Sequence, residues 1–195
     1  MNLKERIIYE SLRLFSRNGF LNTSISDIMD AAKISKGGFY NHFKTKEDLL
    51  LAVLDEARKV WRDRNLAGVD DILQPMAKIK KLLENYRDRY LKDEEALPGG
   101  CIFLTLSVEL DPQEFPAARE ITDGFDRVRR LLNRLLEQAK ESGELRREVD
   151  TAAVAEMLFA GLLGAAVLHG TTKSSLNLDR AINALLAYLD GLAPR

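Results

Sequence analysis

The residues best suited to chemistry lie in one short stretch near the amino end, SKGGFYNHFKTKEDLL, which runs from Ser35 to Leu50. Around a pair of glycines it holds three lysines, one histidine and three hydroxyl side chains. Four lysines and no carboxylate lie in the segment from Lys33 to Lys46. Such a group of donors makes a local positive field, which suits the phosphates of a polyanion. A solvated helix end would carry the same charges, so charge alone leaves both interpretations open.

The rest of the chain carries the opposite charge. Residues 1–48 have eight basic and six acidic side chains, whereas all 195 residues have 29 and 30, for a net charge of −1. The amino-terminal segment is therefore a basic region in a slightly acidic protein. This asymmetry suits a polyanionic partner for that segment, but on charge alone a solvated helix end remains the first interpretation.

The same counts indicate the compartment. A single cysteine, Cys101, cannot form an internal disulfide, which fits a reducing compartment. The first 15 residues include five charged side chains, so they do not form a signal peptide. The longest apolar run, Met157 to Leu168, is about half of what a bilayer-spanning helix requires. We expect a cytoplasmic protein with no membrane partner.

Helical elements must position the basic stretch. Apolar residues recur at intervals of three and four along nearly the whole chain, which predicts an all-α fold. A first helix ends at Gly19, and a second opens with Ser24 and Asp27 as a capping box. Ser35 can cap a very short third helix and Thr45 a fourth. Three helices in about 48 residues are enough for a three-helix DNA-binding head.

Longer helices follow. One apolar stripe passes through Met76, Ile79, Leu83, Tyr86 and Tyr90, and another through Ile121, Phe125, Val128, Leu132, Leu135 and Ala139. Between them, the segment CIFLTLSVEL at 101–110 is nearly all apolar and is predicted to be buried on most sides. Asp150 can cap the next helix. The first of the last two helices is rich in small residues, which suits either core packing or a helix pair that meets its twin across a two-fold axis.

The segment from Thr23 to Leu49 resembles the helix-turn-helix of the TetR family of bacterial transcriptional regulators. The family pattern has a Thr at the second helix, an Ile five residues on, a small pair and a Val/Ile-Ser before the recognition helix. It continues with a Gly, an apolar-Tyr pair, a His/Tyr-Phe pair, and a Lys followed by an acid and Leu. The matching residues are Thr23, Ile28, Ala31, Ala32, Ile34, Ser35, Gly37, Phe39, Tyr40, His42, Phe43, Lys46, Glu47 and Leu49.

The resemblance implies two domains and a DNA interface. A TetR-type head would occupy residues 1–60, with its helix-turn-helix at about 24–43, and a helical effector-binding and dimerisation domain would occupy 61–195. Thr23, Tyr40 and Lys46 would clamp phosphates, since amides and hydroxyls at helix starts can hold them. His42 would add a phosphate contact, while Lys36 and, second, Asn41 would reach base edges. The full predicted set is Thr23, Ser24, Ser35, Lys36, Gly37, Gly38, Tyr40, Asn41, His42 and Lys46.

Two residues depart from the family pattern. Lys33 stands where members usually have glycine in the turn, a position that favours positive φ and that lysine tolerates poorly. Gly38 stands where many relatives present a side chain to the bases. We expect a reshaped turn and a specificity that depends on Lys36, its neighbours and DNA shape.

The resemblance also implies that the remaining helices form a homodimer and enclose a pocket for an unknown small-molecule effector. The apolar character of the pocket candidates favours a hydrophobic or aromatic effector. Each candidate is also a plausible core residue. The predicted ligand-binding residues are Tyr86, Tyr90, Cys101, Phe103, Phe125, Met157, Phe159 and His169. The predicted dimer residues are Ala160, Gly161, Gly164, Ala165, Leu185 and Tyr188.

The function implied is a ligand-inducible homodimeric repressor of a palindromic operator in double-stranded DNA. One rival is an enzyme, but two histidines and one cysteine cannot build a Cys/His metal site, and no HExxH, nucleophile elbow or phosphate loop is present. We therefore expect no catalytic residue, metal or cofactor. The other rival is a helical interaction module that does not bind DNA.

Overall fold

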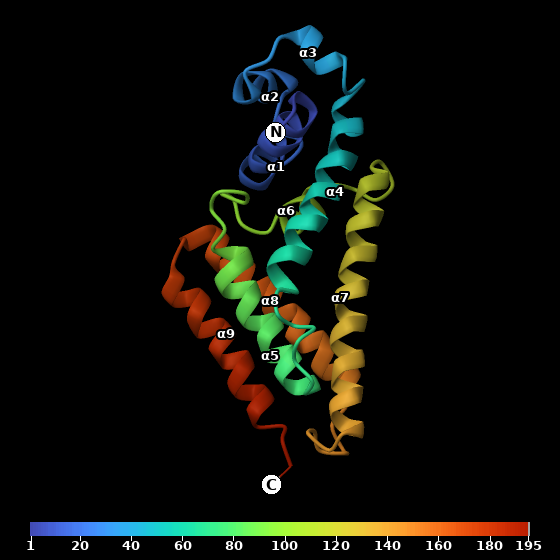
Figure 1. The fold of residues 1–195 in the computed structure, drawn as a ribbon, viewed down its shortest axis with the longest axis vertical. Helices are drawn as coiled ribbons and strands as arrows, with labels where there is room; N and C mark the ends of the chain where they lie inside the picture. Colours follow the sequence, from blue (N-terminus) through green and yellow to red (C-terminus); the bar gives the residue numbers. More distant parts are fainter. Residues whose placement is uncertain (195) are drawn as a thin grey trace. The chain divides into compact units, whose positions relative to one another are not determined.

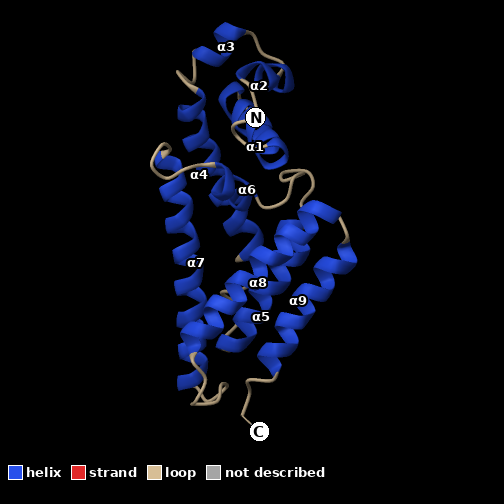
Figure 2. Cartoon of the chain, turned by 180° about the vertical axis from the view of Figure 1, so that it is seen from behind, coloured by secondary structure: helices blue, strands red, loops and turns tan. Residues whose placement is uncertain are grey.

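The computed structural model describes residues 1–194, and this part of the chain contains helices and no strand (Figures 1 and 2). The all-α class that the periodicity predicts is therefore confirmed. In chain order the elements are α1 (Leu3–Asn18), α2 (Ile25–Ala32), α3 (Lys36–Tyr40), α4 (Lys46–Asn65), α5 (Pro75–Asn85), the π-helix η1 (Tyr86–Leu91), α6 (Ile102–Glu109), α7 (Pro116–Glu141), α8 (Thr151–Thr172) and α9 (Ser175–Asp190).

These helices group into two compact units. The first contains Met1–Trp61 and Asp93–Thr122, and the second contains Arg62–Lys92 and the chain from Asp123 onward. The end of the first segment lies beside the predicted domain boundary at residue 60. The sequence did not predict that 93–122, which includes α6, would join the amino-terminal helices.

Local capping sets the start of each helix in the head. The Ser24 hydroxyl accepts from the amide of Asp27, and the Asp27 carboxylate accepts from the amide of Ser24 at 2.8 Å. Ser35 caps α3 with its hydroxyl, and Thr45 and Asp48 form the same reciprocal pair at α4. The three caps predicted from the sequence are confirmed. Each exposes unpaired amides of a first turn toward solvent.

A small aromatic core supports these caps. Ile28, Phe39 and Phe43 are buried, as their positions in the motif predict, and Phe15 and Phe20 are buried with them. Within this unit α1 packs against both α2 and α6. The core therefore joins the amino-terminal helices to a helix about 100 residues away in sequence.

The prediction for residues 101–110 was wrong in one respect. Within α6, Ile102 and Leu106 are buried, but Val108 is 81% exposed and Leu104 is half-buried. An eight-residue helix that packs on α1 along one side leaves its other side uncovered. The segment thus contains more apolar side chains than this subunit buries.

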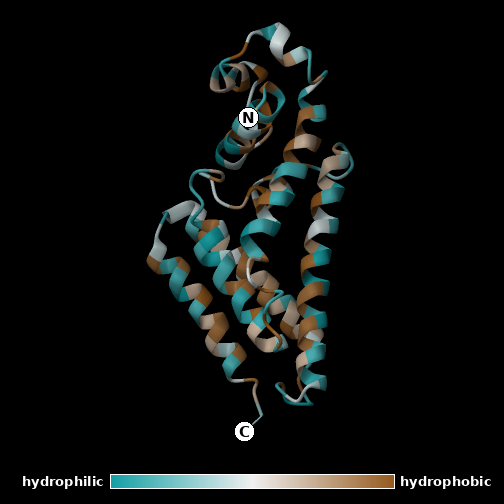
Figure 3. Cartoon of the chain, in the orientation of Figure 1, coloured by the Kyte–Doolittle hydropathy of each residue, from teal (hydrophilic) through white to brown (hydrophobic). Residues whose placement is uncertain are grey.

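In the second unit α8 and α9 form a hairpin, and α5 with η1 packs on it. Asp150 caps α8 as predicted, since its carboxylate accepts from the Ala153 amide. Figure 3 shows apolar residues recurring between polar ones along α7, the pattern of an amphipathic helix. Among the described helices, α8 alone is long and apolar enough to cross a membrane by length and composition.

The π-helix was not predicted. It continues α5, so that the stripe through Ile79 and Leu83 extends to Tyr86 and Tyr90, whose rings stack with centroids 5.5 Å apart. Just before it, the buried Asn85 amide donates to two backbone carbonyls of the turn after α4, those of Asn65 and Ala67. Asn85 therefore closes that turn.

Candidate nucleic-acid interface

The turn between α2 and α3 is built around Lys33. Its backbone is left-handed, with φ 52° and ψ 55°, and its amide donates to Asp30. The expectation that this position needs positive φ is confirmed. The chain therefore makes the turn with lysine, although this left-handed conformation is less favourable for lysine than for glycine.

Most of the predicted DNA-binding residues share one exposed region. Lys36, Tyr40 and Asn41 are exposed on α3 and its exit, and Tyr40 stands edge to face on the buried Phe39 ring at 5.3 Å. The Tyr40 side chain remains 45% exposed beside this ring. The other exposed members of the set are Ser24, Ser35, Gly37 and His42.

The two glycines of α3 differ in their surroundings. A Cβ at Gly38 would contact Ile34, Ser35 and Leu3 at 3.6–3.9 Å, whereas one at Gly37 would have the Ser35 hydroxyl alone within 4 Å. Gly38 thus faces the turn and α1, and Gly37 faces open space. The expectation that Gly38 is a missing base reader stays a prediction, since a side chain could be accommodated at either glycine.

Thr23 is buried, unlike the other predicted DNA-binding residues. Its side chain is 0% exposed, and its hydroxyl donates to the Gly19 carbonyl at 2.7 Å. Its amide donates to Phe20. Both of its donors are therefore used inside the loop between α1 and α2, so Thr23 shapes that loop and has no donor directed at a phosphate.

Lys46 is half-buried and has internal partners. Its ammonium donates to the carbonyls of Phe20 and Thr23, both at 2.9 Å, and lies 4.2 Å from the centroid of the Phe20 ring. An ammonium has three N–H donors, so one remains. A phosphate contact by Lys46 stays a prediction that depends on this third donor.

Glu109, at the end of α6, was not among the residues predicted from the sequence. Its carboxylate accepts from the amides of Phe20 and Leu21 in the same α1–α2 loop. One signal could have indicated it, because Glu109 is the sole charged residue in the apolar run 101–110. A lone charge in such a run usually has a specific partner.

The predicted ligand-binding residues divide between the two units. Cys101 and Phe103 belong to the first unit and the other six to the second. In the second unit Phe125 and Phe159 meet edge to face at 5.4 Å, and Tyr86 and Tyr90 form the stack described above. His169 is buried and Met157 is 37% exposed. Their role in binding a ligand stays a prediction.

The predicted dimer residues also fall into two groups. Ala160, Gly164 and Tyr188 are exposed, and a Cβ at Gly164 would have nothing within 4 Å. Gly161 instead packs inside the subunit, because a Cβ there would lie 2.8 Å from Leu185 of α9. Ala165 is likewise buried within the subunit, and the close approach of Gly161 to Leu185 joins α8 to α9 within one chain.

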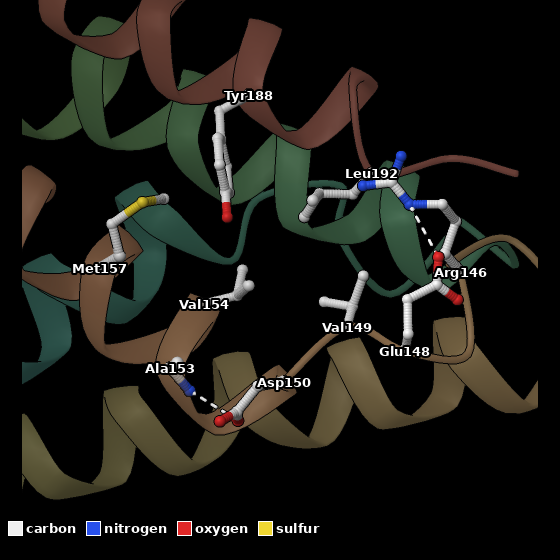
Figure 4. Close-up of a pocket in the computed structure, with 9 residues that line it drawn as sticks. All are labelled: Arg146, Glu148, Val149, Asp150, Ala153, Val154, Met157, Tyr188 and Leu192. Carbon is white, nitrogen blue, oxygen red and sulfur yellow. Dashed lines mark hydrogen bonds and ion pairs between the residues drawn. The ribbon is translucent and has the colours of Figure 1, made fainter.

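An open pocket of about 460 Å³ lies between the start of α8 and the end of α9 (Figure 4). Met157, from the predicted ligand-binding set, and Tyr188, from the predicted dimer set, line it on opposite helices. Arg146 and Glu148 form an ion pair at one end, with Nε and Oε1 3.6 Å apart. The remaining lining residues are Val149, Asp150, Ala153, Val154 and Leu192. In the described part of the chain, no three His, Cys, Asp or Glu side chains are grouped so that they could hold a metal.

Comparison with known proteins covers both units. Residues 7–53 match the family model of bacterial regulatory proteins, tetR family, and residues 75–185 match the model of the tetracyclin repressor-like, C-terminal domain. The HTH-type transcriptional repressor DhaR of Mycobacterium sp. (strain GP1) is 25% identical over 188 residues, which are 96% of this chain and 92% of DhaR.

Solved structures share the fold along the whole chain. A TetR transcriptional regulator from Chloroflexus aurantiacus J-10-FL has a TM-score of 0.89 at 29% identity, over 98% of this chain and 96% of that one. AibR, solved in complex with isovaleryl coenzyme A and operator DNA, has a TM-score of 0.75 at 20% identity, over 96% and 97%. At this lower identity the likeness concerns the fold.

Proposed function

The chain belongs to the TetR family of bacterial regulatory proteins and is a DNA-binding transcriptional regulator, and from this premise we propose that it represses transcription as a homodimer on a palindromic operator. A small apolar or aromatic effector releases it from DNA, and the protein acts in the cytoplasm. Half-sites one helical turn apart, about 34–36 Å, must be met at once by the two heads. An effector that prefers another spacing of the heads therefore lowers operator affinity.

The observation that carries the proposal is the exposed α3 surface with its capped helix starts. Lys36 lies at the first position of α3 and is free of carboxylate neighbours in sequence, so its ammonium can reach acceptors of guanine in the major groove. Asn41 is a second base-reading candidate. Tyr40, His42 and Ser35 supply donors for phosphates on this region, whereas the amide and hydroxyl of Ser24 both donate to Asp27.

Dimer formation is supported by the exposed side of α8. This helix exposes Ala160, Gly164, Val167 and Leu168. The subunit buries only part of its long apolar sequence. Small residues at this face allow two helices to approach closely, as in a four-helix interface. Pairing of two copies would cover an apolar face that is otherwise open to water.

The test is operator binding as a function of salt. Affinity for a duplex from the region upstream of its own gene should fall by about 10³-fold or more between 50 and 200 mM salt if six or more phosphates are contacted. Lys36→Ala should weaken discrimination at particular base pairs by about 1–3 kcal/mol.

The matched control is Arg147→Ala, which removes one positive charge from an exposed position in the second unit. It should leave sequence preference unchanged. Absence of duplex binding by the wild-type protein at low salt would refute the proposed function. An unchanged sequence preference in Lys36→Ala would refute only the role of Lys36.

A further inference from the structure

The loop that joins α1 to α2, residues 19–23, is held by two oppositely charged side chains. The Glu109 carboxylate of α6 accepts from the amide of Phe20 at 2.7 Å and from that of Leu21 at 2.8 Å. On the other side, the Lys46 ammonium at the start of α4 donates to carbonyls of the same loop. All three elements belong to the first unit. A short surface loop thus has its peptide groups paired with a carboxylate and an ammonium at the same time.

The geometry at Gly19 makes room for this carboxylate. Gly19 has φ 81°, and a Cβ at this position would lie 2.6 Å from Oε1 of Glu109. Any other residue would therefore combine an unfavourable backbone conformation with a clash against the carboxylate. Glycine at the end of α1 is what allows the carboxylate to reach the two amides that follow it.

The segments on either side of α6 also meet the end of α1. Before α6, Gly99 lies so close that a Cβ would be 1.7 Å from the Ser16 carbonyl, and its amide donates to the Ser16 hydroxyl. After α6, the Phe115 ring meets the Phe20 ring edge to face, with centroids 5.8 Å apart. Contacts at both ends of α6 therefore accompany the Glu109 bonds, so α6 and the loop form one packed assembly.

The loop in turn sets the start of α2. Thr23 donates its hydroxyl to Gly19 across the loop, and the next residue, Ser24, is the cap of α2. Under the proposed function, the first turn of α2 faces phosphates. A displacement of the loop would move this turn with it, because only one residue separates the bonded carbonyl of Thr23 from the first helical residue, Ile25.

We propose that Glu109 is a positioning residue for operator binding, which ties α6 to the α1–α2 loop and thereby fixes the phosphate-facing start of α2. The inference rests on the proposed function and deepens it. Glu109 contacts no DNA in this role. It acts through the amides of Phe20 and Leu21, with the charge of its carboxylate strengthening both bonds.

The experiment compares Glu109→Gln with Glu114→Gln in the full-length protein. Both remove one negative charge from the same region of the first unit, but Glu114 is exposed and has no role in the loop. A glutamine at 109 retains one oxygen acceptor and loses the second. We expect amide hydrogen exchange at Phe20 and Leu21 to accelerate by roughly tenfold or more in Glu109→Gln and to remain unchanged in Glu114→Gln.

Operator affinity separates positioning from a purely structural role. Loss of a negative charge near DNA should by itself strengthen binding slightly, as Glu114→Gln will report. Glu109→Gln should instead weaken operator binding by roughly tenfold relative to Glu114→Gln. Glu109→Asp retains the charge and should bind the operator more tightly than Glu109→Gln, and it serves as the test variant if the glutamine variant does not fold.

Two results would overturn the inference. One is exchange at Phe20 and Leu21 that is unaffected by Glu109→Gln. The other is equal operator affinity of the folded Glu109→Gln and Glu114→Gln proteins. If the wild-type protein binds the operator with the expected salt dependence and the two variants bind equally, the positioning role is wrong and the proposed function stands. If the wild-type protein binds no duplex at low salt, both fail.

Discussion

At the scale of single residues, Lys33 shows how the turn between α2 and α3 is made at a cost in stability. A left-handed backbone brings Cβ close to the following carbonyl oxygen, which costs a residue other than glycine about 1–2 kcal/mol. Lys33 adopts this conformation with φ 52°. The side chain itself is exposed, so no burial offsets the cost at this position.

Lys33→Gly should therefore raise the free energy of unfolding by about 0.5–1 kcal/mol, after the greater freedom of glycine in the unfolded chain is subtracted. Urea denaturation at neutral pH measures this change. Lys44→Gly is the matched control, since Lys44 is exposed and its φ is not positive. A gain of the same size in the control would show that the lost charge, and not the backbone, is responsible.

Asp27 makes the start of α2 sensitive to acid. Its pKa is lowered, chiefly because the Ser24 hydroxyl donates to the carboxylate and also because the Ser24 amide does. A lowered pKa in the folded state means that the carboxylate stabilises α2 fully above the ordinary value of about 3.9. This contribution is lost as the pH falls through the lower, folded value.

The sign can be checked by an NMR titration of the Asp27 carboxyl in the wild-type protein and in Ser24→Ala. The substitution removes the hydroxyl donor, so the pKa of Asp27 should rise toward its ordinary value. An Asp27 pKa that is the same in both proteins would mean that the hydroxyl does not stabilise the ionised carboxylate.

The residue scale also shows what sequence can predict. The pairs Ser24 with Asp27 and Thr45 with Asp48 lie three residues apart, and such local bonds follow from spacing alone. The burial of Thr23 does not, because it depends on how the whole loop is held. Glu109 lies 89 residues from Phe20, and no local rule relates them.

At the scale of elements, α8 uses small residues for two different purposes. Gly161 lets α9 approach within the subunit, where Leu185 occupies the space that a side chain would take. Gly164 is exposed and has nothing beside it in the chain. One helix thus has a packed side within its own subunit and an open apolar side, where we propose that the second subunit binds.

Gly164→Glu should abolish association of subunits and leave each of them folded. Glutamate favours a helix over glycine by about 0.5–1 kcal/mol, but it would put a charge into the proposed apolar interface. Sedimentation velocity should show a monomer, with helix content by circular dichroism unchanged.

Gly124→Glu on α7 is the matched control, because it is also a glycine inside a helix with one distant side-chain neighbour. It should remain a dimer. A dimeric Gly164→Glu would exclude this side of α8 as the contact between subunits.

Sequence patterns describe elements well and their irregularities poorly. The stripe through Ile79 and Leu83 predicted a helix that continues through Tyr90, and the chain does continue. The change to a π-helix at Tyr86 leaves the same apolar residues buried, so periodicity carries no trace of it. The closure of the turn by Asn85 could not be predicted either, because its partners are backbone carbonyls, which every residue has.

At the scale of the whole molecule, the division into units departs from chain order. The helix-turn-helix could be recognised in sequence because its caps and aromatic core lie within about 30 residues. The membership of 93–122 in the first unit could not, because it rests on contacts such as Gly99 with Ser16 and Phe115 with Phe20. The DNA-binding head is therefore larger than its motif.

This division predicts that residues 1–61 alone will not retain the stability of the first unit. Removal of 93–122 leaves the amides of Phe20 and Leu21 without their acceptor and exposes one side of Phe20. Circular dichroism should show less helix per residue in the fragment 1–61 than in the intact protein, and the fragment should melt at a lower temperature than the intact protein. Joining 93–122 to it through a flexible linker should restore amide protection at Phe20 and Leu21.

An isolated fragment that melts like the intact protein would contradict this view. It would mean that the motif and its aromatic core are sufficient and that α6 adds little. The same result with protected Phe20 and Leu21 amides would identify another acceptor for them.

The bonds between Glu109 and the loop have a consequence for how this regulator can diverge. On the α6 side they require a particular side chain, but on the loop side they require backbone amides, which every residue except proline provides. Substitutions at Leu21, whose side chain is exposed, therefore leave the connection intact. Residues of the proposed operator-facing surface can therefore change during evolution, toward a new target sequence, while the bonds between the loop and α6 are kept.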